Sequence, residues 1–98
     1  MPILRRNITA NDLHQLKIFI EQVHLETNKY PTSLAELPGL ERDARNLTTL
    51  IKDGDLILAG GKNDVLAYAK DGFERRSAVL MKTGVQEMEP DELKRLVQ

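Results

Sequence analysis

The sequence predicts an α+β fold with a long N-terminal helix, short helices, a four-stranded antiparallel sheet and a C-terminal helix. Three observations lead to this fold class. Apolar residues recur at helical spacing over the first third of the chain, short runs rich in β-branched and large apolar residues fill residues 55–88, and a proline followed by acidic residues opens the last segment. At 98 residues the chain suits a single domain, 1–98, that buries roughly two-thirds of its unfolded surface.

The first helix is expected to begin at a cap formed by Thr9 or Asn11, with residues 1–8 flexible before it. Asn28 tolerates the left-handed conformation that ends a helix, and Pro31 holds the residue before it extended, so the helix should stop before Tyr30. At about 100° per residue, five apolar residues fall within about 120° of one another and should face the core: Leu13, Leu16, Phe19, Ile20 and Val23.

A tight corner and a second helix are expected next. Ser33 and Glu36 have the spacing of a capping box, which starts a short helix that Pro38-Gly39 ends. Apolar residues then keep helical spacing over residues 42–52 until Asp53-Gly54. We therefore expect a turn, a short helix and a second helix between the first helix and the sheet.

The period then changes to that of short strands. Four strands are expected at residues 55–60, 64–70, 77–82 and 85–88, with Thr83-Gly84 in the tightest turn. Pro90 suits the first position of a final helix that should run to about Val97. Tyr68 and Met81 are expected to face the long helix from the sheet.

No spacing typical of a catalytic or metal centre is present. His14 and His24 project about 80° apart on the first helix, unlike an i, i+4 metal pair. The chain has no cysteine, and Asp53, Asp55 and Asp64 around the first strand fit turns better than a calcium loop. "AGGKND" (59–64) should be a hairpin loop, because a phosphate loop would precede a helix. We expect no enzyme and no cofactor, and a hydrolase with a carboxylate-held metal has the least support.

Charge and hydropathy restrict the partners. Fourteen Lys and Arg against fifteen Asp and Glu give a net charge of −1, which does not favour nucleic acid. Basic pairs occur at Arg5-Arg6 and Arg75-Arg76, but they are too short to follow a phosphate backbone. No apolar run approaches the roughly 18 residues of a membrane helix, so a membrane is expected only through an anchor that this chain lacks. We therefore expect the chain to bind protein partners or to associate with itself.

Two stretches resemble a known family. "DLHQLKIFIEQVHLETNKYPTSLAEL" resembles the start of the soluble domain of type II secretion pseudopilins, in which a long helix ends in a Tyr-Pro, Ser-Leu bend. "AVLMKTGVQEMEPDELKRLV" is similar to the planctomycete-type, prepilin-processing-associated family, although Lys82-Thr83-Gly84 replaces its usual Ala-Asp-Gly. The resemblance implies a domain presented in the periplasm or cell envelope by an anchor helix. It supplies no catalytic residues.

The leading hypothesis is therefore a non-catalytic protein-interaction or structural domain of pseudopilin-like type. The alternative is a small cytosolic ligand-binding or regulatory module. Ile18 and Leu25 project about 20° from each other and roughly opposite the core-facing stripe, so they form a second apolar ridge. Either residues 42–52 or the C-terminal helix cover this ridge, or it is exposed and docks a neighbouring subunit. In the second case its flanks are His14, Glu21 and Gln22.

Overall fold

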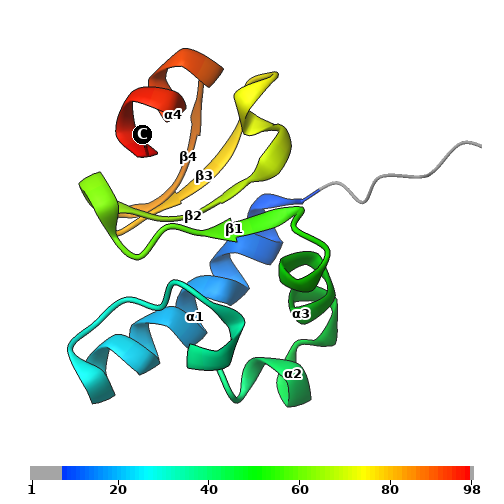
Figure 1. Ribbon diagram of the computed structural model, residues 1–98, viewed down its shortest axis with the longest axis vertical. Coiled ribbons are helices and arrows are strands. Elements are labelled where there is room, and N and C mark those ends of the chain that lie inside the picture. Colours follow the sequence, from blue (N-terminus) through cyan, green and yellow to red (C-terminus); the bar gives the residue numbers. More distant parts are fainter. Residues whose placement is uncertain (1–7, 98) are drawn as a thin grey trace, which may run out of the picture.

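The computed structural model describes residues 8–97, which form a four-stranded antiparallel sheet between two helical layers (Figure 1). The long helix α1 packs on one face together with α3, and the C-terminal helix α4 packs on the other. The predicted α+β fold class is confirmed. Of the stretch expected to be flexible, residues 1–7 lie outside the described residues, and Ile8 packs against the core. The helices are α1 (Ala10–Thr27), α2 (Leu40–Asp43), α3 (Arg45–Lys52) and α4 (Pro90–Val97), with 3₁₀ turns η1 (Leu34–Glu36), η2 (Lys62–Asp64) and η3 (Lys70–Phe73).

Both ends of α1 are fixed by the residues that the sequence indicated. The Thr9 hydroxyl accepts a hydrogen bond from the Asp12 amide at 3.2 Å, and the Asp12 carboxylate accepts one from the Thr9 amide at 3.1 Å. At the other end Asn28 adopts the left-handed conformation with φ 60° and donates its amide to the His24 carbonyl. Thr9, rather than Asn11, is therefore the cap.

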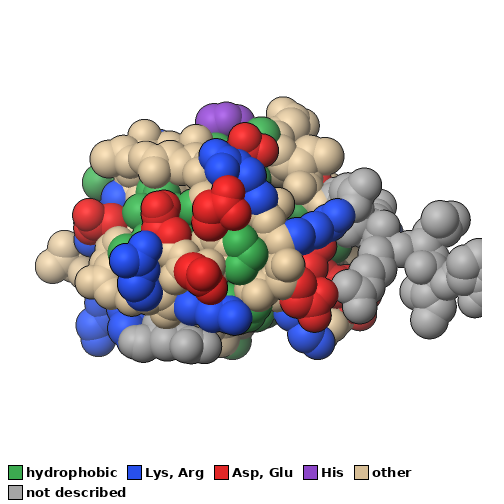
Figure 2. Space-filling model, turned by 90° about the horizontal axis from the view of Figure 1, so that it is seen from above, with side chains coloured by type: hydrophobic (Ala, Val, Ile, Leu, Met, Phe, Trp, Pro, Cys, Tyr) green, Lys and Arg blue, Asp and Glu red, His purple; other side chains and the backbone are tan. Residues whose placement is uncertain are grey.

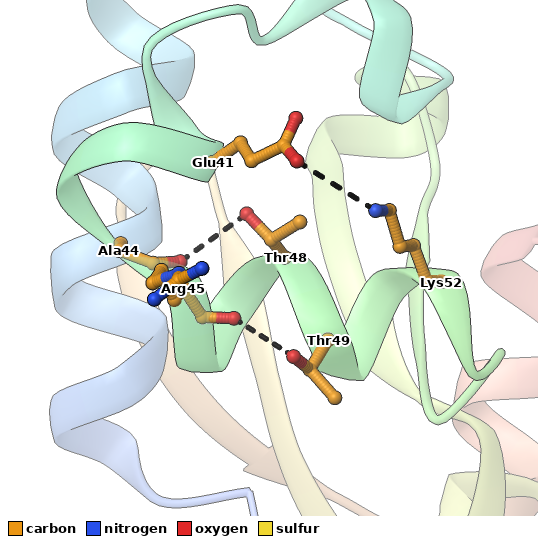
Figure 3. A network of polar contacts seen from close by, with 6 residues as sticks. All are labelled: Glu41, Ala44, Arg45, Thr48, Thr49 and Lys52. Carbon is orange, nitrogen blue, oxygen red and sulfur yellow. Dashed lines mark hydrogen bonds and ion pairs between the residues drawn. The ribbon is translucent and has the colours of Figure 1, made fainter.

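The prediction of a single helix over residues 42–52 is wrong for the first part of that range. Ala44 leaves the helical conformation at φ −147° and ψ 70°, which separates α2 from α3. The bend lets Leu40 on α2 and Leu47 on α3 both reach the core, where each is fully buried. Figure 3 shows the polar side of this bend, where the Thr48 hydroxyl donates to the Ala44 carbonyl at 3.3 Å. Two further contacts lie beside it: Thr49 Oγ1 to the Arg45 carbonyl at 3.0 Å, and Lys52 Nζ to Glu41 Oε1 at 3.8 Å.

The four-stranded antiparallel sheet was predicted, and its strands have the simplest order, β1-β2-β3-β4. A register shift between Val65 and Ala67 turns Leu66 and Ala67 to the same side. Because β2 is covered on both faces, all of its residues are buried. The observed strands are slightly shorter than expected at most ends: β1 (Leu56–Leu58), β2 (Val65–Ala69), β3 (Ser77–Met81) and β4 (Gly84–Met88).

Two cores result, one on each face. The larger core joins α1, α2 and α3 to the sheet through residues such as Leu16, Leu47 and Leu80. The smaller core lies under α4, and its buried members are Val65, Tyr68, Val79, Met88 and Leu93. Tyr68 belongs to this second core and Met81 packs against it, so the expectation that both face the long helix is wrong. Side chains alternate along β3, and Ala78 and Leu80 take the face that α1 covers.

The corner after α1 is built as the sequence predicted. Ser33 and Glu36 form a capping box around η1. One oxygen of the Glu36 carboxylate accepts hydrogen bonds from the Thr32 amide at 2.7 Å and the Ser33 amide at 3.0 Å. The bonds from Thr32, and then those from Ser33, lower the pKa of the Glu36 carboxyl. The corner is thus stabilised by an ionised side chain.

Candidate interaction surface

The outer face of α1 carries the apolar ridge that the sequence indicated. Ile18 is 68% exposed and Leu25 is 85% exposed, and they are the two large hydrophobic side chains so exposed among residues 8–97. The expectation that residues 42–52 or the C-terminal helix cover the ridge is wrong. Scattered surface hydrophobics are ordinary in soluble proteins, so the position of this pair matters more than its presence.

The geometry of α1 explains why the ridge faces away from the sheet. Leu13, Leu16 and Ile20 are fully or almost fully buried against the larger core. Ile18 and Leu25 lie roughly opposite those three residues at 100° per residue. A helix that packs on its inner side leaves most of this ridge exposed in the described part of the chain.

The flanks of the ridge are polar. His14 and Gln22, which the sequence placed beside the ridge, are both exposed. Lys17 Nζ lies 3.3 Å from Glu21 Oε1, one turn further along α1. An apolar centre with a polar, solvent-accessible rim is the usual composition of a protein-binding patch, and here the patch is small.

The corner holds the C-terminal end of α1 on the sheet. The His24 imidazole stacks on the Tyr30 ring with centroids 4.0 Å apart and an interplanar angle of 6°. Lys82 Nζ, from the turn between β3 and β4, lies 4.9 Å from the centroid of the same ring. The sequence did not indicate this contact, because no residue spacing shows that the left-handed cap at Asn28 returns Tyr30 onto His24. These contacts hold the end of α1 that carries Leu25 in place against the rest of the chain.

A second, polar hollow lies where β1 and β3 begin and β2 ends, and the sequence did not indicate it. Asp55, Lys70 and Ser77 are among the residues that line it. Two of its cations already have carboxylate partners: Arg75 with Asp71 at 2.7 Å and Arg76 with Glu89 at 2.7 Å. These pairs neutralise two of the cations that line the hollow.

The residues that could have held a metal are dispersed. Within residues 8–97 no three His, Asp or Glu side chains converge as metal ligands would. Asp64 lies in the loop after β1 at φ 70° and pairs with Lys82 at 3.5 Å. The Asp55 carbonyl accepts the Lys70 amide at 2.9 Å beside the first strand pair.

Charge is mixed on the face of the molecule that Figure 2 shows. This view, from above Figure 1 onto the side where α4 lies, shows basic and acidic side chains interspersed. The described residues of this face do not form the single-sign stripe that follows a nucleic-acid backbone. None of the helices within the described residues has the length and apolarity needed to cross a lipid bilayer.

Comparison with known proteins found no match among protein-family models, curated proteins or solved structures. Any functional argument therefore depends on the surfaces of this chain.

Proposed function

We propose that this chain is a non-catalytic protein-interaction or structural domain that docks a protein partner through the outer face of α1. The main observation in support of this proposal is the ridge of Ile18 and Leu25, two large aliphatic side chains exposed on the side of α1 opposite its core-facing residues. Fully burying such a side chain is worth about 1.5 to 3 kcal/mol. A partner surface that covers both side chains would therefore stabilise the complex relative to the isolated chain.

The pseudopilin-like assignment is part of this proposal. It is supported by the order of a long helix, a Tyr30-Pro31 corner, a capping box at Ser33 and an antiparallel sheet. The same assignment suggests a domain displayed in the cell envelope by an anchor. In that setting the outer face of α1 would meet other subunits of an assembly.

The test compares the native chain with a variant that carries Ile18→Glu and Leu25→Glu. Sedimentation velocity over a range of concentrations reports self-association, and a photo-crosslinking residue at position 22 in living cells reports other partners. We expect a discrete crosslinked complex at position 22 that the double variant abolishes, and any self-association through α1 should be weaker in that variant. Native chain co-expressed without the crosslinking residue should compete with the crosslink, and a crosslinker at Thr49, exposed on α3, serves as the control. Absence of a crosslinked product at position 22, or a product that the double variant retains, would overturn the proposal.

A small ligand-binding module is the second candidate, and the polar hollow beside Lys70 favours it. Lys70 makes no ion pair within the described residues, and the hollow also contains the carboxylate-bearing Asp55 and Glu74. A thermal-shift screen with phosphate, carboxylates and amino acids tests this candidate directly, because a ligand that binds the folded state raises the melting temperature. Lys70→Ala should remove any such shift.

A further inference from the structure

The outer edge of β4 offers unpaired backbone at the side of the sheet. In the part of the chain that the structure describes, β4 pairs with β3 alone, and its register from Gly84 to Met88 is regular. The opposite edge strand, β1, has three residues, whereas β4 has five. β4 also contains no proline and no bulge, which are common devices that prevent edge pairing.

The hairpin register identifies which backbone groups face outward. Thr83 lies in a two-residue turn, so Met81 and Gly84 form a hydrogen-bonded pair at its base. Hydrogen-bonded and non-hydrogen-bonded pairs alternate along an antiparallel ladder. Val85 and Glu87 therefore turn their amide and carbonyl groups away from β3, toward solvent.

We propose that β4 pairs antiparallel with β4 of a second copy of this chain, about a two-fold axis at Gln86. In this register Val85 of one copy lies opposite Glu87 of the other, and both residues have outward-facing backbone groups. The two four-stranded sheets would then form one continuous sheet. A centre at Gln86 is the register in which all five residues of each β4 overlap.

The distribution of charge along β4 favours this occupant and this register. The β4 end that leads to Glu89 lies opposite the turn of the second copy, which carries Lys82, although each of these side chains also has an ion-pair partner in its own chain: Asp64 for Lys82 and Arg76 for Glu89. With the axis at Gln86, no two like charges face each other within the paired strands. An axis at Glu87 would instead place the Glu87 carboxylates of the two copies opposite each other. Exposed Glu87 could instead act as a charge that prevents pairing. Arg76 lies 3.9 Å from Glu87 and 2.7 Å from Glu89, so much of this repulsion is already compensated.

This inference does not depend on the ridge of α1, and its test removes the ridge. All measurements use the full chain with Ile18→Glu and Leu25→Glu, or with serine at both positions if the glutamates prevent folding. The chain has no cysteine, so Gln86→Cys introduces a single thiol at the proposed axis. Directly opposed positions in a non-hydrogen-bonded pair bring Cβ atoms to within about 5.5 Å, which is close enough to form a disulfide with little movement.

We expect Gln86→Cys to form a disulfide-linked dimer at least about tenfold faster than Thr49→Cys, an exposed position on α3, because pairing raises the effective thiol concentration. Gln86→Lys should place two like charges at the axis. It should shift the sedimentation profile to the monomer while leaving the melting temperature of the dilute chain unchanged. Equal rates for the two cysteine variants, or a chain that is monomeric at about 1 mM, would overturn the inference.

Discussion

Tyr30 lies so close to Gly61 that a Cβ atom built on the glycine would be 2.8 Å from Cδ2 of the ring. The neighbouring Gly60 is equally constrained, because its Cβ would lie 2.5 Å from Cγ2 of Thr32. The corner after α1 therefore rests directly on the loop between β1 and β2. Both glycines also have positive φ, at 68° and 83°. This contact fixes the helical half of the chain onto the sheet.

Gly61→Ala should destabilise the fold more than Gly54→Ala. Both positions have φ near +80°, a conformation that costs a non-glycine residue about 1 kcal/mol. No atom of the described residues lies within 4 Å of a Cβ at Gly54, whereas the Cβ at Gly61 meets Tyr30, and overpacking adds about 1 to 3 kcal/mol. Urea unfolding of both variants measures the difference, and equal losses would show that the corner yields without cost.

Leu16→Ala and Ile20→Ala should each cost about 2 to 5 kcal/mol of unfolding free energy, because each leaves a cavity in the larger core. The two side chains are 0% and 1% exposed. Ile18→Ala, on the same helix but outside the core, provides the matched control and should cost well under 1 kcal/mol. Losses below 1 kcal/mol for both core variants would place the core on another face of α1.

Stability should fall at acid pH partly through Glu36. Hydrogen bonds from Thr32, then those from Ser33, hold the pKa of this carboxyl below its ordinary value of 4.5. A group whose folded-state pKa is lowered stabilises the fold above its unfolded pKa, and the contribution disappears as the pH falls through the folded pKa. The expected window therefore lies below pH 4.5.

Glu36→Gln tests this linkage. The amide keeps the shape of the side chain but cannot ionise, so the melting temperature of the variant should depend less on pH below 4.5 than that of the native chain. Thermal melts across the acid range, with the exposed Glu26→Gln as control, provide the measurement. Parallel curves for the native chain and the Glu36 variant would contradict the prediction.

Ser77→Ala should leave the fold equally stable or more stable. The Ser77 hydroxyl is buried with no hydrogen-bond partner among the described residues, and such a group costs about 1 to 3 kcal/mol. Thr48→Val should instead lose about 1 kcal/mol, since the Thr48 hydroxyl is buried and donates to the Ala44 carbonyl. Differential scanning calorimetry of the two variants tests this contrast, and a marked loss for Ser77→Ala would mean that its hydroxyl has a partner in solution.

Local chemistry made much of this fold predictable. The cap at Thr9, the left-handed Asn28 and the capping box of Ser33 with Glu36 each depend on residues a few positions apart. The four strands followed from a change of hydrophobic period between Gly54 and Pro90. The exposed ridge could be located because Ile18 and Leu25 fall opposite a well-defined stripe.

Long-range geometry was not predictable from the same patterns. Which face of the sheet α1 covers depends on strand register, so Tyr68 and Met81 were placed on the wrong side. The bend at Ala44 interrupts an apolar pattern that reads as one helix, because Leu40 and Leu47 must both reach the core. The stacking of His24 on Tyr30 depends on the chain reversal at the corner, and the spacing of residues in the sequence does not reveal this reversal.

The most direct test of the central claim, that the outer face of α1 is a free surface able to dock a partner, is the unfolding free energy of two matched double variants. Ile18→Glu with Leu25→Glu adds two charges on the ridge, and Leu16→Glu with Ile20→Glu adds two in the core. We predict that the ridge variant stays within about 1 kcal/mol of the native chain, whereas the core variant, which buries unpaired carboxylates, does not fold. A ridge variant that also loses its cooperative transition would contradict the account and make the ridge part of the core.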